Sequence, residues 1–120
     1  MRVALVALAG ATGALARYAI WLAVGARSFP WPTLAINLSG SLLLAFVLTF
    51  GTERGWSPSV TVPLAIGFLG AYTTFSTFSY ETFALVRNHR AALAAIYVAV
   101  SVAGGILAAL AGYGAARKLA

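Results

Sequence analysis

The chain has 120 residues, of which 62% are hydrophobic and 8% are charged, and its formal net charge is +6. Its mean hydropathy of +0.93 is far above that of a soluble domain, in which about a quarter of the residues are charged. The composition therefore predicts a membrane protein without a soluble domain and without the exposed basic surface that nucleic-acid binding needs.

The chain also lacks the side chains that most enzymes use. It has no cysteine, which excludes disulfides and thiolate metal sites. Its one histidine, His89, falls in a polar loop, and its only acidic residues are Glu53 and Glu81. This inventory is too poor for a Ser-His-Asp arrangement or a catalytic carboxylate pair. We therefore expect no enzyme. The positive charge suits contact with anionic lipid headgroups, and it would also favour anions in a pore.

The first apolar segment is predicted to cross the membrane as a helix over residues 3–24. It is long enough to span a bilayer, which takes about 20 residues, and too long for the core of a cleaved signal peptide. Arg17 lies inside it. An arginine there either marks a functional site or extends its side chain to the headgroups, and it could do both at the mouth of a water-filled pathway.

The second predicted span covers residues 32–51 and carries Asn37 and Ser41, which are four apart and share a helix face. The amide of Asn37 could bond a neighbouring helix or donate hydrogen bonds to a solute that passes. The pattern by itself favours the contact between helices.

The third span, residues 59–86, is longer than one ordinary crossing and contains the stretch Gly70–Thr74. Glycine and threonine weaken a helix interior, which predicts a break there, with a kinked continuous helix as the alternative. Unwound backbone at membrane depth persists only where protein or water covers it. Freed carbonyls can then bind a cation, and a half-helix N-terminus can face an anion.

The half of this span that follows the predicted break has polar groups on every side. Phe75 and Phe78 share one face at 3.6 residues per turn, and hydroxyl-bearing residues fill the other directions up to Glu81. Such a segment has no face suited to lipid. It is therefore expected at the centre of an assembly.

The fourth span, residues 91–113, carries a stripe of small and polar residues in which Tyr97 and Ser101 could take part in chemistry. Four crossings place the basic residues on two sides in nearly equal numbers: Arg2, Arg54, Arg117 and Lys118 on one, and Arg27, Arg87 and Arg90 on the other, with Arg17 if it extends that way. The positive-inside rule then gives no orientation, which makes an antiparallel homodimer available.

Three stretches of the sequence resemble the Fluc or CrcB family of small fluoride channels, and the resemblance covers nearly the whole chain. They are Gly-Ala-Thr-Gly-Ala-Leu-Ala-Arg-Tyr (10–18), Pro-Thr-Leu-Ala-Ile-Asn-Leu-Ser-Gly-Ser (32–41) and Gly-Phe-Leu-Gly-Ala-Tyr-Thr-Thr-Phe-Ser-Thr-Phe-Ser-Tyr-Glu (67–81). The third is the most specific, because a Gly-x-x-Gly followed by Thr-Thr-Phe-Ser-Thr-Phe is not a general membrane pattern.

The resemblance implies an antiparallel, dual-topology homodimer of four-span subunits in the plasma membrane, with two pathways that export fluoride passively. It implies the following roles: Phe75 and Phe78 as pore phenylalanines, Asn37 as a pore-lining amide, Arg17 at the aqueous mouth, Thr77, Tyr97 and Ser101 in the polar lining, and the backbone carbonyls of Gly70 and Thr73 as ligands of a structural Na⁺ shared by both subunits. Gly105 departs from the family, whose members often carry a hydroxyl there.

Two other functions are also compatible with the sequence. A small proton-coupled multidrug exporter would also have four short spans, but it needs a carboxylate in the first span, and residues 3–24 contain none. Glu81 is the only candidate, and its place at the end of the third span favours a residue of the vestibule. A structural subunit without transport activity would use the same residues for packing alone.

Overall fold

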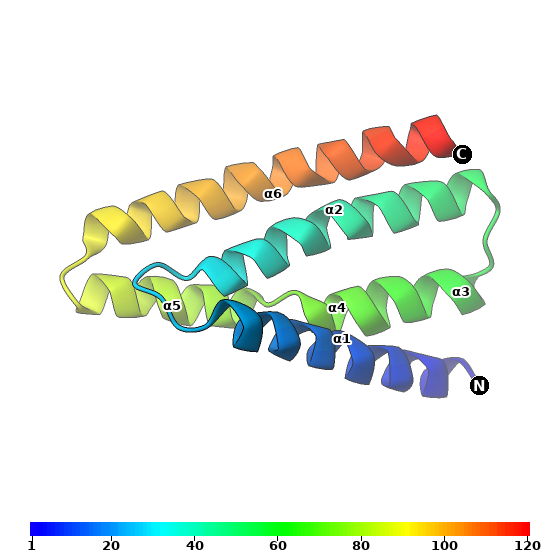
Figure 1. Ribbon diagram of the computed structural model, residues 1–120. Coiled ribbons are helices and arrows are strands. Elements are labelled where there is room, and N and C mark those ends of the chain that lie inside the picture. The colour runs from blue at the N-terminus through cyan, green and yellow to red at the C-terminus, as the bar shows by residue number, and fades with distance from the viewer.

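The computed structural model describes residues 1–120 as helices joined by short loops (Figure 1). Three spans are single helices: α1 (Arg2–Val24), α2 (Trp31–Glu53) and α6 (Ala91–Leu119). The third span is built from four pieces: α3 (Pro58–Val62), the π-helical segment η1 (Pro63–Leu69), α4 (Gly70–Tyr72) and α5 (Phe75–Arg87). Both termini lie at the same end of the molecule, as four crossings require.

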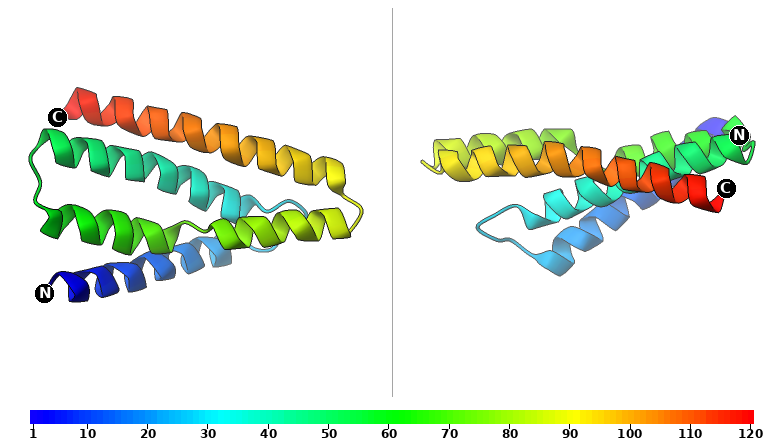
Figure 2. Two further views of the ribbon diagram at one scale, coloured as in Figure 1. Left: turned by 180° about the vertical axis from the view of Figure 1, so that it is seen from behind. Right: turned by 90° about the horizontal axis from the view of Figure 1, so that it is seen from above.

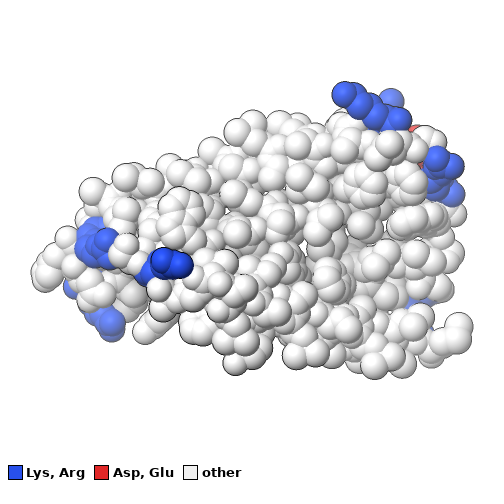
Figure 3. All heavy atoms as spheres, viewed as in Figure 1, with Lys and Arg blue, Asp and Glu red and all other residues white.

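Four helical stretches are long and apolar enough to cross a membrane, so the predicted all-helical, four-span fold is confirmed. Only 17 of the 120 residues are buried, so most of the apolar surface needs lipid or another protein to cover it. Figure 3 shows the lysines and arginines gathered towards the two ends, with an uncharged band between them. This distribution matches a bilayer core with headgroups on both sides.

Small residues bring the helices close together. α2 packs mainly against α6, and α1 packs mainly against η1 (Figure 2). A Cβ added at Gly112 of α6 would overlap the carbonyl of Leu42 in α2, and one added at Gly13 of α1 would overlap the carbonyl of Phe68 in η1. Glycine is therefore required at both helix crossings, as in other membrane helix pairs.

We expect Gly112→Ala to lower the free energy of unfolding by about 1–3 kcal/mol, because the added methyl group overpacks the contact between α2 and α6. Gly114→Ala is the matched control, since nothing lies within 4 Å of a Cβ at that position, and alanine there improves helix propensity. Thermal unfolding in detergent compares the two variants. Equal midpoints would contradict the close approach at Gly112.

The predicted break in the third span is confirmed, and it falls at Thr73 and Thr74. Their backbones are extended, with φ/ψ of −78°/157° and −149°/107°. The π-helical turn that precedes the break was not predicted. It begins at Pro63, a residue that has no amide hydrogen to donate to the preceding turn.

Candidate functional site

The break in the third span is held on α2 by two hydrogen-bonded pairs. On the α5 side, Asn37 bonds the backbone of Thr74 with both atoms of its amide: Nδ2 donates to the Thr74 carbonyl (3.2 Å) and Oδ1 accepts from the Thr74 N–H (2.9 Å). On the α4 side, the hydroxyls of Ser39 and Tyr72 lie 2.8 Å apart. The Asn37 amide thus replaces the backbone partners that Thr74 would have in a continuous helix.

The side chain of Thr74 caps the N-terminus of α5. Its Oγ1 accepts from the N–H of Thr77 (3.3 Å) and donates to the Thr77 hydroxyl (2.8 Å), as an N-cap residue does. The hydroxyl proton of Thr77 is then free to donate to something else. Helix α5 also directs its positive dipole end at the break, which favours a negative charge there.

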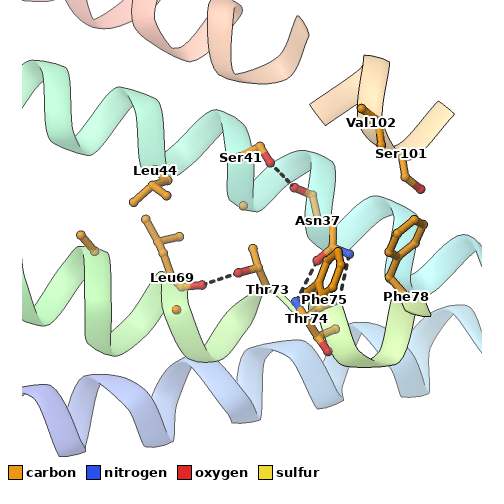
Figure 4. A pocket seen from close by; sticks show the side chains of 13 residues that line it. Asn37, Ser41, Leu44, Leu69, Thr73, Thr74, Phe75, Phe78, Ser101 and Val102 are labelled. Carbon is orange, nitrogen blue, oxygen red and sulfur yellow. Dashed lines mark hydrogen bonds between the residues drawn. The ribbon is translucent and has the colours of Figure 1, made fainter. Parts of the chain in front are cut away.

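A pocket of about 320 Å³ opens between α2, α6 and the broken span. All three contribute polar groups to its lining, and α5 adds two aromatic rings. The lining includes Asn37, Ser41, Thr73, Thr74, Phe75, Phe78 and Ser101 (Figure 4). The Ser101 hydroxyl is buried and has no hydrogen-bond partner. A buried hydroxyl of this kind calls for an explanation, and a polar ligand in the pocket would supply its partner.

The two phenylalanines stand at different depths in this pocket. Their ring centroids are 5.9 Å apart, and the rings of Phe78 and Tyr97 form a T-shaped pair with centroids 5.1 Å apart. Phe78 is half-buried, whereas Phe75 is 80% exposed. Because aromatic rings are electropositive at their edges, the pair can present weakly attractive edges to an anion.

A second pocket of about 320 Å³ lies on another side of α5 and holds two more of the predicted residues. Arg17 and Thr77 line it together with Trp21, Thr33 and Thr74. The structure thus brings Asn37, Phe75, Phe78 and Ser101 together in one pocket, and Arg17 and Thr77 in the other. Thr74 lines both pockets.

Tyr97 lines neither pocket. It is fully buried, and its hydroxyl donates to Oε2 of Glu81 (2.7 Å). Thr33, which is 2% exposed, donates to Oε1 of the same carboxylate (2.9 Å). The carboxylate therefore has a hydroxyl donor on each oxygen. No role for Thr33 is predicted from the sequence, and Glu81 is predicted only as a vestibule residue or an exporter's carboxylate. The one local signal for this contact is an acidic residue at the end of an apolar span.

The carbonyls of Gly70 and Thr73, predicted as cation ligands, have no hydrogen-bond donor in the structure. The carbonyl oxygen of Thr73 accepts no hydrogen bond, and the Thr74 N–H that would reach Gly70 in a continuous helix bonds Asn37 instead. No group of three or more His, Cys, Asp or Glu side chains could hold a metal ion. Elsewhere, a Cβ at Gly105 would stand 3.7 Å from the Ser41 hydroxyl, which leaves room for a small side chain.

Comparisons with known proteins agree on one family. Residues 4–113 match the family model described as "CrcB-like protein, Camphor Resistance (CrcB)". The chain is 45% identical over 116 residues to "Fluoride-specific ion channel FluC 2" of Geobacillus kaustophilus, covering 93% of this chain and 90% of that protein. It is 45% identical over 116 residues to "Fluoride-specific ion channel FluC" of Magnetococcus marinus (93% and 94% covered). It is 41% identical over 118 residues to the protein of that name in Geobacter sulfurreducens (95% and 95% covered).

Proposed function

This chain belongs to the CrcB-like family, and we propose that it is a fluoride-selective ion channel. Fluoride leaves the cytoplasm passively through it, which lowers the toxicity of fluoride to the cell. The chain is a multi-pass protein of the plasma membrane. A channel of this kind transports an ion and catalyses no reaction.

The observation that carries this proposal is the unpaired, buried hydroxyl of Ser101 in a pocket that also holds Phe75 and Phe78. A small anion must exchange its hydration shell for protein donors as it enters a pore. Ser101 offers one such donor, and the second proton on Asn37 Nδ2 offers another, because only one is used at Thr74. A hydrogen bond to an ion is about twice as strong as one between neutral groups.

The other predicted pathway residues fit supporting roles. Thr77 has a free proton at the N-terminus of α5, and Arg17 in the second pocket would draw anions towards the mouth. Tyr97 donates its hydroxyl hydrogen bond to Glu81, so it would act by fixing the position of the Phe78 ring and not as a donor to the ion. The pocket groups carry no full positive charge, which suits release of the ion as much as its entry.

We also propose that two antiparallel copies form the channel. Gly70 is exposed and Phe75 is 80% exposed at the break. A backbone carbonyl without a donor, such as that of Gly70, cannot face lipid without a large cost in free energy. Another protein surface must therefore cover it, and a second copy of the chain has the same need. The nearly equal numbers of basic residues on the two sides allow copies of either orientation.

A structural Na⁺ would complete this interface. Hard cations take oxygen ligands, and the carbonyls of Gly70 and Thr73 from both copies would supply them. The ion would offset the crowding of carbonyl dipoles at the break and add a positive field beside the two pathways. A rise in the melting temperature of the dimer with Na⁺, at constant ionic strength, would support this site.

Fluoride efflux from liposomes tests the proposed function. Vesicles that contain the purified protein and are loaded with equal concentrations of KF and KCl should release fluoride rapidly after valinomycin is added, and retain their chloride. The two ions are followed with selective electrodes, and protein-free vesicles are the control. Chloride loss at the same rate as fluoride loss would contradict the proposed selectivity.

The multidrug-exporter alternative is not favoured. The named relatives are fluoride channels, α1 contains no carboxylate, and both oxygens of Glu81 are engaged by Thr33 and Tyr97.

A further inference from the structure

The side chain of Asn37 does more than face a pathway, because both of its polar atoms bond the backbone of one residue across 37 positions of sequence. A primary amide can pair with a peptide unit in this way because it carries the same donor and acceptor groups. Here the pairing falls on Thr74, the second extended residue of the break.

The pairing changes what the preceding turn can bond. In an α-helix the N–H of residue 74 would donate to the carbonyl of residue 70. Asn37 Oδ1 takes that N–H at 2.9 Å, so Gly70 loses its helical donor. The carbonyl of Thr73 also has no donor. Both carbonyls are those proposed above as ligands of Na⁺.

We infer that Asn37 is the positioning residue of the cation site: its amide takes the Thr74 N–H away from Gly70 and thereby keeps the third span open for Na⁺. This inference rests on the sodium site proposed above. The cation does not contact Asn37, which acts through the backbone of Thr74. The remaining Nδ2 proton stays available to the anion, so one side chain supports both ions.

The hydrogen-bonded pair of Ser39 and Tyr72 provides a control for Asn37. Ser39 and Tyr72 hold the α4 side of the break through their hydroxyls, and neither touches the Thr74 N–H. Loss of the hydrogen bond between Ser39 and Tyr72 should weaken the attachment of the third span to α2. The Thr74 N–H would still bond Asn37, so the Gly70 carbonyl would stay available to the cation. Overall stability and sodium affinity are therefore expected to separate between the two pairs.

The experiment measures the melting temperature of the purified dimer as NaCl replaces choline chloride at constant ionic strength. Ligand binding to the folded state raises stability with concentration, so the Na⁺ concentration at half the total rise reports affinity. We expect this midpoint Na⁺ concentration to be about tenfold higher for Asn37→Leu than for the unaltered protein. If Asn37→Leu does not fold, Asn37→Ser replaces it, because the serine side chain is too short to reach Thr74, and the same shift is expected. Ser39→Ala should melt at a lower temperature with an unchanged Na⁺ midpoint.

Two results would overturn the inference: an Asn37 variant with the unaltered Na⁺ midpoint, or Ser39→Ala with as large a shift as Asn37→Leu. If the unaltered protein showed no response to Na⁺, the sodium site itself would be wrong together with this inference. Fluoride efflux from liposomes stands apart from both, so a failure of the channel function would be seen separately.

Discussion

Phe78→Ile is expected to slow fluoride efflux from liposomes by at least about tenfold, which corresponds to about 1.4 kcal/mol at the barrier. Isoleucine fills much of the same space but has no electropositive ring edge. It would leave an aliphatic surface beside the unpaired hydroxyl of Ser101 and remove the edge contact with Tyr97. The initial rate of fluoride release, normalised to the amount of dimer, is the measurement.

Phe83→Ile is the matched control for this variant. Phe83 lies on the same helix, is 57% exposed, and lines neither of the two pockets described above. The Phe83→Ile variant should therefore release fluoride at the same rate as the unaltered protein. If Phe78→Ile forms the dimer and conducts as well as Phe83→Ile, the ring has no role in transport, and a purely structural function for α5 would be favoured.

The second large effect is expected on stability, from Glu81→Leu. This change removes the acceptor of two hydroxyls, on Thr33 and Tyr97, that are 2% and 0% exposed. An unsatisfied buried polar group costs about 1–3 kcal/mol, so the free energy of unfolding should fall by about 2–6 kcal/mol. Glu81→Gln keeps one acceptor oxygen and should lose clearly less.

Glu53→Leu provides the comparison for Glu81, since it alters the only other acidic residue. Glu53 and Arg117 form an exposed pair at 3.6 Å, and pairs of that kind contribute little to stability. Thermal unfolding in detergent should therefore order the variants as Glu53→Leu, Glu81→Gln and Glu81→Leu, from most to least stable. Equal midpoints for the two Glu81 variants would refute the requirement for an acceptor there.

The spans and the break could be predicted because they depend on local composition. Apolar length identifies a crossing regardless of its partners, and the glycine and threonines of 70–74 weaken a helix wherever it lies. The π-helical turn could not be predicted in the same way, because it is a choice of hydrogen-bond register and not of residue type. Pro63 was its only local signal.

The contacts that organise the site could not be predicted because they join distant parts of the chain. Asn37 meets Thr74 across 37 positions and Thr33 meets Glu81 across 48. No periodicity within one helix encodes such a pair, since it depends on how far α5 is displaced beside α2. Sequence patterning alone therefore favoured a contact between helices for Asn37, without indicating that its target is the backbone of the break.

The π-helical segment η1 has a consequence for how the length of this chain can vary in evolution. A wide turn of this kind holds one more residue than the α-helical turn that it replaces, so η1 amounts to a one-residue insertion in the third span. Deleting one residue from η1 would restore α-helical bonding and leave Thr74 opposite Asn37. The same deletion within α5 would rotate every later side chain by about 100°. Single-residue differences in length are therefore expected to gather in residues 63–69, and to be absent between Phe75 and Glu81.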